Sequence, residues 1–449
     1  TETTINELYA GTLPTALPAG DKLIAYWNFN DVSPNGVFVS FSPAPDATDG
    51  APNLVEVVHA QGSSPWDLEK VGLEIDGVAV APQVERDAGR VTVRYVPSPI
   101  FAQASTHTAT LIYPKADGTL AKRSWQFAVA AYTQDTLHQY LGVLTGTAQF
   151  TADGGGRTGQ VGDYGIDFGQ VNAGQSVHVP DATFLNAATA NDEMAVGAWQ
   201  KLYAIANSSL FWGVSPSSSG TQRGWTMHTP WSNNTLYFDT AGCCDAATQR
   251  VSQAMTVDLF PAYSGDVSWW QDWHYLLFQK KLSTKEIWID GELFFIGDST
   301  TPLPTDFTEA YFGYSLGDNV SLFGIIDDMA VFKTALDETT VKAVFNGTKP
   351  AALPAEAGLI AFWDFNDPPP AVHPTLSVTR SGNELTITSD PQPLPTGFVL
   401  QTAPSVLGPW TTQTGANTPI TVPIGNEQAL FPSPLTRFDP GVLMRSDPF

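Results

Sequence analysis

An internal repeat constrains this 449-residue chain more than any other feature. Residues 14–31 read PTALPAGDKLIAYWNFND and residues 350–367 read PAALPAEAGLIAFWDFND, with twelve of eighteen positions identical. Each copy is a Pro-containing linker followed by an apolar run, Leu23–Phe29 or Leu359–Phe365. Side chains alternate along a strand, so each run would present apolar residues on both faces of a sheet. The repeat therefore predicts an architecture of related β modules.

The rest of the chain also favours strands. Short runs rich in Val, Ile, Thr, Tyr, Phe and Trp are separated by Gly, Pro, Asp and Asn, and patterns with helical spacing are scarce. The segment 33–135 carries such runs at close intervals, with hairpin signals at Asp76-Gly77 and Asp117-Gly118. These features predict an immunoglobulin-like sandwich with Trp125 in its core. The segment 371–449 predicts a second small sandwich, similar to fibronectin-type or Ig-like C-terminal modules of bacterial surface proteins.

The middle of the chain, 136–349, is the largest unit. Its strand-like runs follow one another at 162–169, 175–185, 194–205, 235–242, 273–281, 286–297 and 325–336. Together with the opening LIAYWNFND, their order resembles the laminin-G-like jelly roll of the concanavalin A-like superfamily. The predicted fold is all-β, with five parts: 1–32 (linker and first jelly-roll strand), 33–135 (inserted Ig-like domain), 136–349 (jelly roll), 350–370 (repeated linker and strand) and 371–449 (C-terminal Ig/fibronectin-like domain).

In this arrangement the second repeat copy, 359–367, has no jelly roll of its own after it. A lone apolar strand is unstable in water with its hydrogen-bonding groups unpaired. It could pair within its own chain, pack on the C-terminal module, or insert into a neighbouring subunit as an added strand. The last alternative predicts a filament subunit, assembled through five apolar residues: Leu359, Ile360, Phe362, Trp363 and Phe365.

The two cysteines, Cys243 and Cys244, are adjacent. They could form a vicinal disulfide, remain free thiols or bond to another chain. An oxidising compartment favours the vicinal disulfide, which would rigidify one loop.

Composition limits the partners. The formal net charge of −24 disfavours binding to nucleic acid and to anionic lipid. The sequence contains no run of 18 apolar residues, so no membrane-spanning helix is predicted. The chain starts at Thr1, and we expect a secreted protein at the cell surface or outside the cell, with its signal peptide removed.

The segment 207–245 interleaves aromatic residues with Asn, Asp, Arg and His. Ring faces can stack on sugar C–H faces while amides hydrogen-bond to hydroxyl groups, so the segment predicts a lectin-like ligand surface as the alternative function. The candidate residues are Trp225, His228, Trp231, Asn233 and Asp239. The laminin-G resemblance also implies calcium, for which Asp167 and Asp327 are candidate ligands.

No catalytic site is predicted. Glu286, Asp290 and Glu292 invite comparison with glycosidase carboxylates, but the Asp290-Gly291 turn would place them across a hairpin. No G-x-S-x-G element or metal-binding His spacing is present. The leading hypothesis is therefore a non-catalytic structural or adhesive protein that self-associates, and the alternative is a protein that binds polysaccharide.

Overall fold

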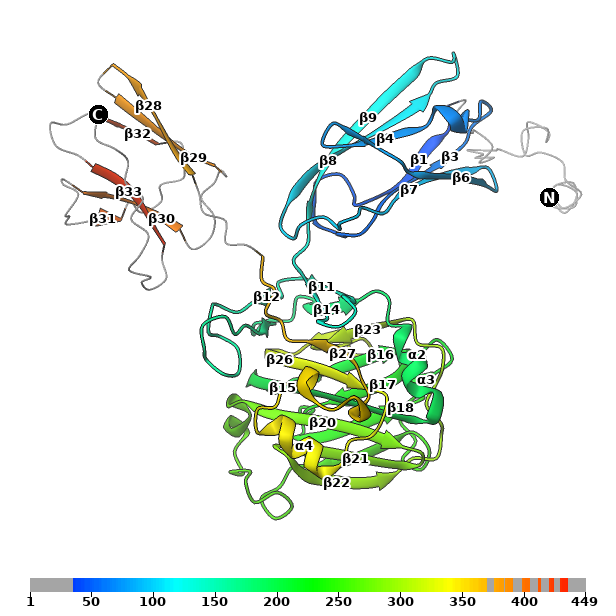
Figure 1. Ribbon diagram of the computed structural model, residues 1–449, viewed down its shortest axis with the longest axis vertical. Coiled ribbons are helices and arrows are strands. Elements are labelled where there is room, and N and C mark those ends of the chain that lie inside the picture. The colour runs from blue at the N-terminus through cyan, green and yellow to red at the C-terminus, as the bar shows by residue number, and fades with distance from the viewer. Residues whose placement is uncertain are drawn as a thin grey trace, which may run out of the picture. The chain divides into compact units, whose positions relative to one another are not determined.

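The computed structural model describes residues 35–369 without a break. In the C-terminal region it describes residues 375–382, 384–390, 398–403, 411–412, 420–423 and 429–434. The first repeat copy, and with it the predicted first jelly-roll strand within 1–32, lies outside the described residues. The chain divides into two units, Thr1–Pro369 and Pro370–Phe449. Both are built from strands (Figure 1), which confirms the all-β prediction.

The first part of the larger unit is a sandwich of a four-stranded and a five-stranded sheet. The four-stranded sheet has the order β1 (Val37–Ser42), β3 (Val55–Ala60), β7 (Arg90–Tyr95) and β6 (Gln83–Asp87). The other has the order β2 (Ala47–Gly50), β9 (Leu120–Val129), β8 (Thr106–Pro114), β4 (Gly72–Ile75) and β5 (Val78–Val80). Trp125 is buried in its core, as predicted, and its indole N–H donates to the Pro43 carbonyl at 3.1 Å.

The second part is a jelly roll of two eight-stranded sheets. Sheet I has the order β10 (Tyr132–Gln134), β11 (Leu141–Thr145), β14 (Ser176–Val179), β23 (Glu309–Phe312), β16 (Phe211–Val214), β17 (Arg223–His228), β18 (Thr235–Thr240) and β19 (Arg250–Ala254). Sheet II has the order β12 (Gln149–Phe150), β13 (Ile166–Asp167), β26 (Phe323–Phe332), β15 (Glu193–Ala204), β20 (His274–Lys281), β21 (Thr284–Ile289) and β22 (Glu292–Asp298), with β27 (Leu359–Trp363) paired to β26.

Alternation along the strands fills the space between the two sheets with apolar side chains. On sheet I, Phe211, Met227 and Phe238 point inward and are almost completely buried. They pack against inward residues of sheet II such as Phe278 and Val331. This shared core holds the two sheets face to face.

The second repeat copy is the last strand of this jelly roll. β27 pairs antiparallel with β26, with Met329 opposite Trp363 and Val331 opposite Ala361. Trp363 and Phe365 are fully buried in the core between the sheets. Of the three alternatives for 359–367, pairing within its own chain is therefore the one that the structure shows, and insertion into a neighbouring subunit, on which the filament hypothesis depends, is not supported. Pairing partners distant in sequence could not be deduced from the strand alone.

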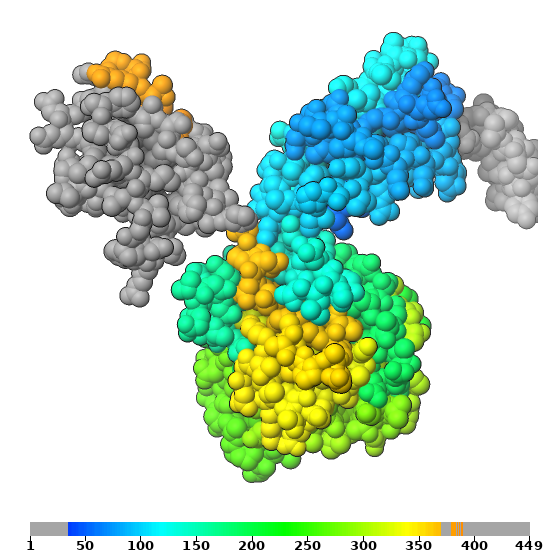
Figure 2. Space-filling model, viewed as in Figure 1, coloured from blue at the N-terminus to red at the C-terminus, as the bar shows by residue number. Residues whose placement is uncertain are grey.

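A short helix and its connections cover the outer face of sheet II. α4 (Glu338–Phe345) begins at Asp337, whose carboxylate accepts a hydrogen bond from the Thr340 N–H at 2.7 Å. Its buried residues Val341 and Val344 pack in a second apolar core on this face. In Figure 2 the segment from α4 to β27, coloured yellow to orange, forms a continuous surface over the jelly roll.

The predicted Asp-Gly hairpins are confirmed. Asp76 and Gly77 connect β4 to β5, and Asp290 and Gly291 connect β21 to β22. All four residues have positive φ, from 52° to 80°, which a two-residue hairpin turn of this type requires.

In the C-terminal unit the described strands form two three-stranded sheets. One has the order β28 (Thr375–Ser381), β29 (Glu384–Asp390) and β32 (Ile420–Pro423), and the other β31 (Thr411–Thr412), β30 (Phe398–Ala403) and β33 (Ala429–Pro434). Among the described residues, no helix has the length and apolar character needed to cross a membrane.

Candidate binding surface on sheet I

The outer face of sheet I carries a row of polar and aromatic residues in cross-strand register. Residues directly opposite one another in a pleated sheet point to the same face. The register pairs His178 with Tyr311, Tyr311 with Trp212, Trp212 with Thr226, Thr226 with Asp239 and Asp239 with Arg250. One side of the sheet therefore presents this outer row across six strands, opposite the apolar core side.

A β-bulge adds an arginine to this face. The register between β16 and β17 shifts where Gly213 faces Trp225 but Val214 faces Arg223, so Gly224 is the extra residue. Without the bulge, Arg223 would share the inward face with Trp225. Bulges re-aim side chains in this way, and here the Arg223 guanidinium lies 4.5 Å from the centre of the Trp212 ring.

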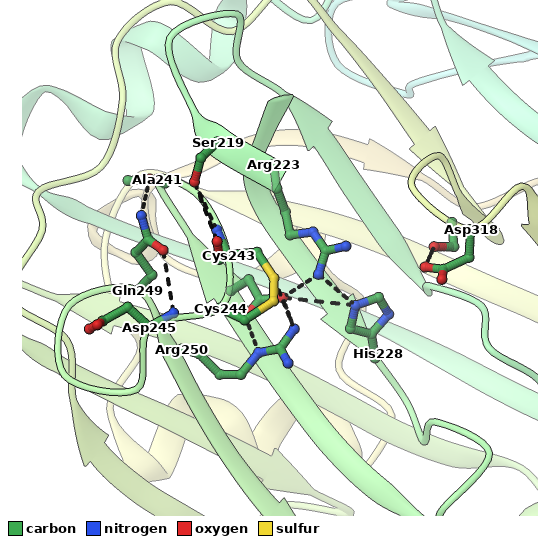
Figure 3. The surroundings of a disulfide bond; sticks show 12 residues. Ser219, Arg223, His228, Ala241, Cys243, Cys244, Asp245, Gln249, Arg250 and Asp318 are labelled. Carbon is green, nitrogen blue, oxygen red and sulfur yellow. Dashed lines mark hydrogen bonds and ion pairs between the residues drawn. A yellow bond between two sulfur atoms is a disulfide. The ribbon is translucent and has the colours of Figure 1, made fainter. Parts of the chain in front are cut away.

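Asp239 is the centre of a buried charged cluster, and its partners Arg223, His228 and Arg250 are labelled in Figure 3. Its carboxylate is fully buried and accepts hydrogen bonds from Arg223 Nη1 at 2.7 Å and from Arg250 Nε at 2.5 Å. Arg250 Nη2 adds a second bond at 2.6 Å, which makes that pair bidentate. Burial alone would raise the pKa of Asp239, but the hydrogen bonds and charge of Arg250, with the charge of Arg223, hold the pKa below its ordinary value. The carboxylate therefore stays ionised.

His228 completes the cluster as a neutral ring. Its Nδ1 lies 3.0 Å from the Ser208 carbonyl, to which it can only donate, so Nε2 is the acceptor facing Arg223 Nη1 at 3.4 Å. Burial lowers the pKa of His228 to about 4, even though the Asp239 charge, 3.9 Å away, acts in the opposite direction. A neutral His228 can accept from Arg223 while leaving the charge of Asp239 to the two guanidinium groups.

Three buried polar atoms on this face have no hydrogen-bond partner among the described residues: Trp212 Nε1, Arg223 Nε and Thr226 Oγ1. An unsatisfied buried donor or acceptor costs about 1–3 kcal/mol, so native proteins rarely leave several together without a water or ligand nearby. All three lie on the outer face, in strands β16 and β17. The outer face therefore holds hydrogen-bonding atoms that no described residue satisfies.

The partly exposed end of the face is an aromatic corner, formed by Trp231, Asn233 and Tyr237. The Trp231 ring packs edge-on against His228 with centroids 4.5 Å apart, and lies at 83° to the Tyr237 ring. The Asn233 side-chain amide donates to the Tyr237 hydroxyl at 2.9 Å. The Arg250 guanidinium lies over the Tyr237 ring, 4.6 Å from the ring centroid. The corner is thus anchored to the Asp239 cluster through His228 and Arg250.

The adjacent loop contains the disulfide between Cys243 and Cys244. Figure 3 shows it beside the Arg250 guanidinium, whose Nη2 lies 3.5 Å from Cys243 Sγ. The loop is held by Asp245, which accepts from the Ala247 and Thr248 N–H groups at 2.9 and 2.8 Å. Cys244 is exposed, so the disulfide borders the outer face of sheet I at the surface.

Four of the five predicted ligand residues lie at this site, and the fifth, Trp225, does not. His228, Trp231, Asn233 and Asp239 belong to the cluster and the aromatic corner, with His228 and Asp239 buried beneath it. Trp225 instead points inward, is fully buried between the sheets and stacks edge-on with Phe238 at 4.6 Å. Strand alternation places Trp225 and His228 on opposite faces, so Trp225 cannot contact a ligand on this surface.

Three residues of the site were missed from the sequence: Tyr237, Arg250 and Tyr311. Tyr237 alternates with the core residues Leu236 and Phe238 in a run that was correctly predicted to be a strand. That alternation was a usable signal. Arg250 and Tyr311 carried no comparable signal, because only the register of β19 and β23 brings them beside Asp239 and Trp212.

The two predicted calcium ligands accept hydrogen bonds from different groups of the protein. Asp167 accepts from the Gly169 N–H at 2.7 Å and from the Tyr203 hydroxyl at 3.1 Å. Asp327 is fully buried and accepts from the Arg157 N–H at 2.9 Å, and burial raises its pKa well above the ordinary value. Among the described residues, no group of three or more acidic, His or Cys side chains could hold a metal ion. Calcium binding stays a prediction.

Two of the three carboxylates near the β21–β22 hairpin are engaged in hydrogen bonds within sheet II. Asp290 accepts from Tyr275 N–H at 2.9 Å and pairs with His274 Nδ1 at 2.7 Å. Glu286 accepts from the Gln279 amide at 2.6 Å and the Trp288 indole at 2.8 Å. Their hydrogen bonds fix strands and a turn of sheet II.

No known family model and no curated protein match the sequence. Solved structures similar in fold include a botulinum neurotoxin type C structure, from work on its interaction with two ganglioside molecules, at 14% identity and TM-score 0.34, covering 48% of this chain and 50% of that chain. Domain 4 of AbnA, a GH43 extracellular arabinanase from Geobacillus stearothermophilus, in complex with arabinotriose, is similar at 16% identity and TM-score 0.33, covering 48% of this chain and 96% of that domain.

The binding domain of botulinum neurotoxin DC, in complex with rat synaptotagmin II, is similar at 11% identity and TM-score 0.33, covering 64% of this chain and 78% of that chain. This chain spans about half the length of the botulinum neurotoxin type C chain. At these identities and TM-scores the likenesses carry no functional argument, and the specific laminin-G resemblance is not confirmed by them.

Proposed function

We propose that the protein is a non-catalytic, extracellular carbohydrate-binding protein whose jelly roll binds polysaccharide at the aromatic corner of sheet I. The observation that carries the proposal is the aromatic corner beside the Asp239 cluster: the partly exposed rings of Trp231 and Tyr237 lie next to Arg250, whose guanidinium is fixed by its ion pair with the buried Asp239. Sugar recognition uses this combination, because rings contact the apolar faces of the sugar while fixed donors and acceptors set its orientation.

The charges of the site support binding rather than catalysis. Its buried carboxylate, Asp239, is engaged by Arg223 and Arg250 and has a lowered pKa, so it is poorly placed to donate a proton. His228 is neutral above about pH 4 and is fully buried, which removes it from contact with a substrate. The remaining accessible groups are hydrogen-bonding and aromatic.

A glycan array followed by titration calorimetry tests the proposal on the full chain. Trp231→Ala should weaken binding by about fivefold, since a single aromatic contact is worth on the order of 1 kcal/mol. Trp273→Ala is the matched control, because it removes the same side chain from the opposite, outer face of sheet II. A folded wild-type chain that binds no glycan, or equal losses in the two variants, would reject the proposal.

A further inference from the structure

The charges beside the aromatic corner do not balance. In the Asp239 cluster, the carboxylate of Asp239 is paired with two guanidinium groups, those of Arg223 and Arg250. The remaining member, His228, is neutral at ordinary pH because burial lowers its pKa to about 4. The cluster therefore keeps an excess of positive charge, although the whole chain has a formal net charge of −24.

A buried lysine adds to this excess from the core side of sheet I. Lys285 Nζ donates to the backbone carbonyls of Phe238 at 3.3 Å and Gln249 at 2.6 Å. These two residues directly precede Asp239 and Arg250 in the chain. Both acceptors are carbonyls rather than carboxylates, so the ammonium group does not reduce the positive charge at this point of the sheet.

The nitrogen atoms left unused at this site are donors. Trp212 Nε1 and Arg223 Nε are buried without a partner among the described residues, and both kinds of nitrogen can only donate. Arg250 binds Asp239 through Nε and Nη2, which leaves Nη1 without a hydrogen bond to any described residue. The Arg250 side chain is 19% exposed and Nη1 is not among the fully buried atoms, so its N–H groups are open to a ligand.

Excess positive charge and free donors together select one class of ligand group. A carboxylate or sulfate group carries negative charge and accepts hydrogen bonds without donating any, and the guanidinium group binds such anions with short, charge-assisted hydrogen bonds. A neutral sugar hydroxyl could accept from Arg250 but would leave the charge uncompensated. The site therefore favours an anionic group over a hydroxyl.

Arg250 lies next to the rings that would hold the sugar. Its guanidinium is 4.6 Å from the centre of the Tyr237 ring, and the centre of the Trp231 ring is 6.4 Å from that of Tyr237. All three side chains are partly exposed. An anionic group on a pyranose that packs on either ring would therefore lie beside Arg250.

The carboxylates of the neighbouring loops are not paired with these arginines. Asp245 accepts from two N–H groups of its own loop, at 2.9 and 2.8 Å, and Asp318 accepts from the Ser315 hydroxyl at 2.9 Å. More distant carboxylates repel an anion only weakly, because the Debye length is about 8 Å at physiological ionic strength. The local excess of positive charge can therefore act on a ligand despite the negative charge of the chain.

We infer that the ligand is an acidic polysaccharide, whose carboxylate or sulfate groups bind Arg250 while its sugar rings pack on Trp231 and Tyr237. This inference rests on the proposed function and adds the substrate class to it. Asp239 holds the Arg250 guanidinium in place before a ligand arrives, so little side-chain entropy is lost on binding. Arg250 is thus the residue that sets specificity for charge.

Paired glycans test the class on the wild-type chain. The array carries oligogalacturonates beside their methyl esters and sulfated galactan oligosaccharides beside their desulfated forms, and titration calorimetry measures both members of each pair that binds. The charged member should bind about tenfold or more tightly than its neutral counterpart, since hydrogen bonds to charged groups are the strong ones. Equal affinities would overturn the inference and leave the proposed function standing. An array on which nothing binds would reject both.

Arg250→Gln tests the residue. This variant should lose about tenfold or more in affinity for the charged glycan and keep its affinity for the neutral one, whereas Trp231→Ala should weaken both alike. Arg94→Gln is the matched control, because it removes the same charge from an exposed position on β7 of the Ig-like sandwich. Equal losses in the two arginine variants, or unchanged affinity in Arg250→Gln, would overturn the inference. If Arg250→Gln does not fold, the paired glycans decide.

Discussion

The two outer faces of the jelly roll differ in what covers them. On sheet II, aromatic and aliphatic residues such as Trp288 and Phe332 are sealed beneath α4 and its connections. On sheet I, the equivalent face carries the Asp239 ion pairs, unpaired polar atoms and the partly exposed aromatic corner. The same pleated geometry thus serves two purposes: one face is a second apolar core, and the other buries an ion-pair cluster beside a partly exposed aromatic corner. Variants in each face should separate stability from binding.

The largest effect is expected on the sealed face. Phe332 is fully buried in the outer apolar core of sheet II, so Phe332→Ala should lower the free energy of unfolding by about 3–5 kcal/mol. Denaturant unfolding measures the loss. If the folded fraction of this variant binds glycan less tightly than the wild type, the two faces are not functionally separate.

A loss nearly as large is expected from the buried charge on sheet I. Asp239→Asn would leave Arg223 without its ionic partner in a site that water does not reach, at a cost of about 3 kcal/mol or more. Asp245→Asn is the control, since it removes a carboxylate from the exposed loop nearby. Equal stability of the two variants would show that the Asp239 cluster does not support this face.

The pH dependence of stability should report on His228. The unfolded chain binds a proton on this residue below its ordinary pKa of 6.5, whereas burial prevents the folded chain from binding it until about pH 4. The unfolded state therefore holds more protons in this window, so stability falls as the pH is lowered from 6.5 to 4, by on the order of 3 kcal/mol for this group. His228→Gln should reduce that slope, measured by urea unfolding at several pH values; His59, which has a similarly lowered pKa, remains in both proteins. An unchanged slope contradicts the assignment.

The smallest effect is expected from the disulfide. A bond between adjacent residues closes almost no loop in the unfolded chain, so Cys243→Ser/Cys244→Ser should change the free energy of unfolding by less than about 1 kcal/mol. Any larger effect should appear in glycan affinity, because the loop borders the Arg250 side of the site. Calorimetric titration and thermal unfolding of the same preparation distinguish a change in glycan affinity from a change in stability.

The sequence predicted local features well and long-range pairing poorly. Hairpins at Asp76 and Asp290 were predictable because two adjacent residues determine the turn. The position of 359–367 was not, because its partner strand β26 can be identified only from the assembled sheet. Within the site, alternation should have separated Trp225 from His228, whereas the bulge that turns Arg223 outward leaves no sequence signature besides Gly224.

The closing bonds of the jelly roll have a mechanical consequence. Asp367, at the end of the domain, is bonded to Thr133 and Gln134 at its beginning, so the chain enters and leaves at one edge. Tension along the polypeptide would act first on the contacts of Asp367 with Thr133 and Gln134. These few hydrogen bonds and the buried Trp363 ring would carry the force, while the other strands remained unstretched. Under load, the jelly roll would therefore unfold first at β27 and the residues that follow it, up to Asp367.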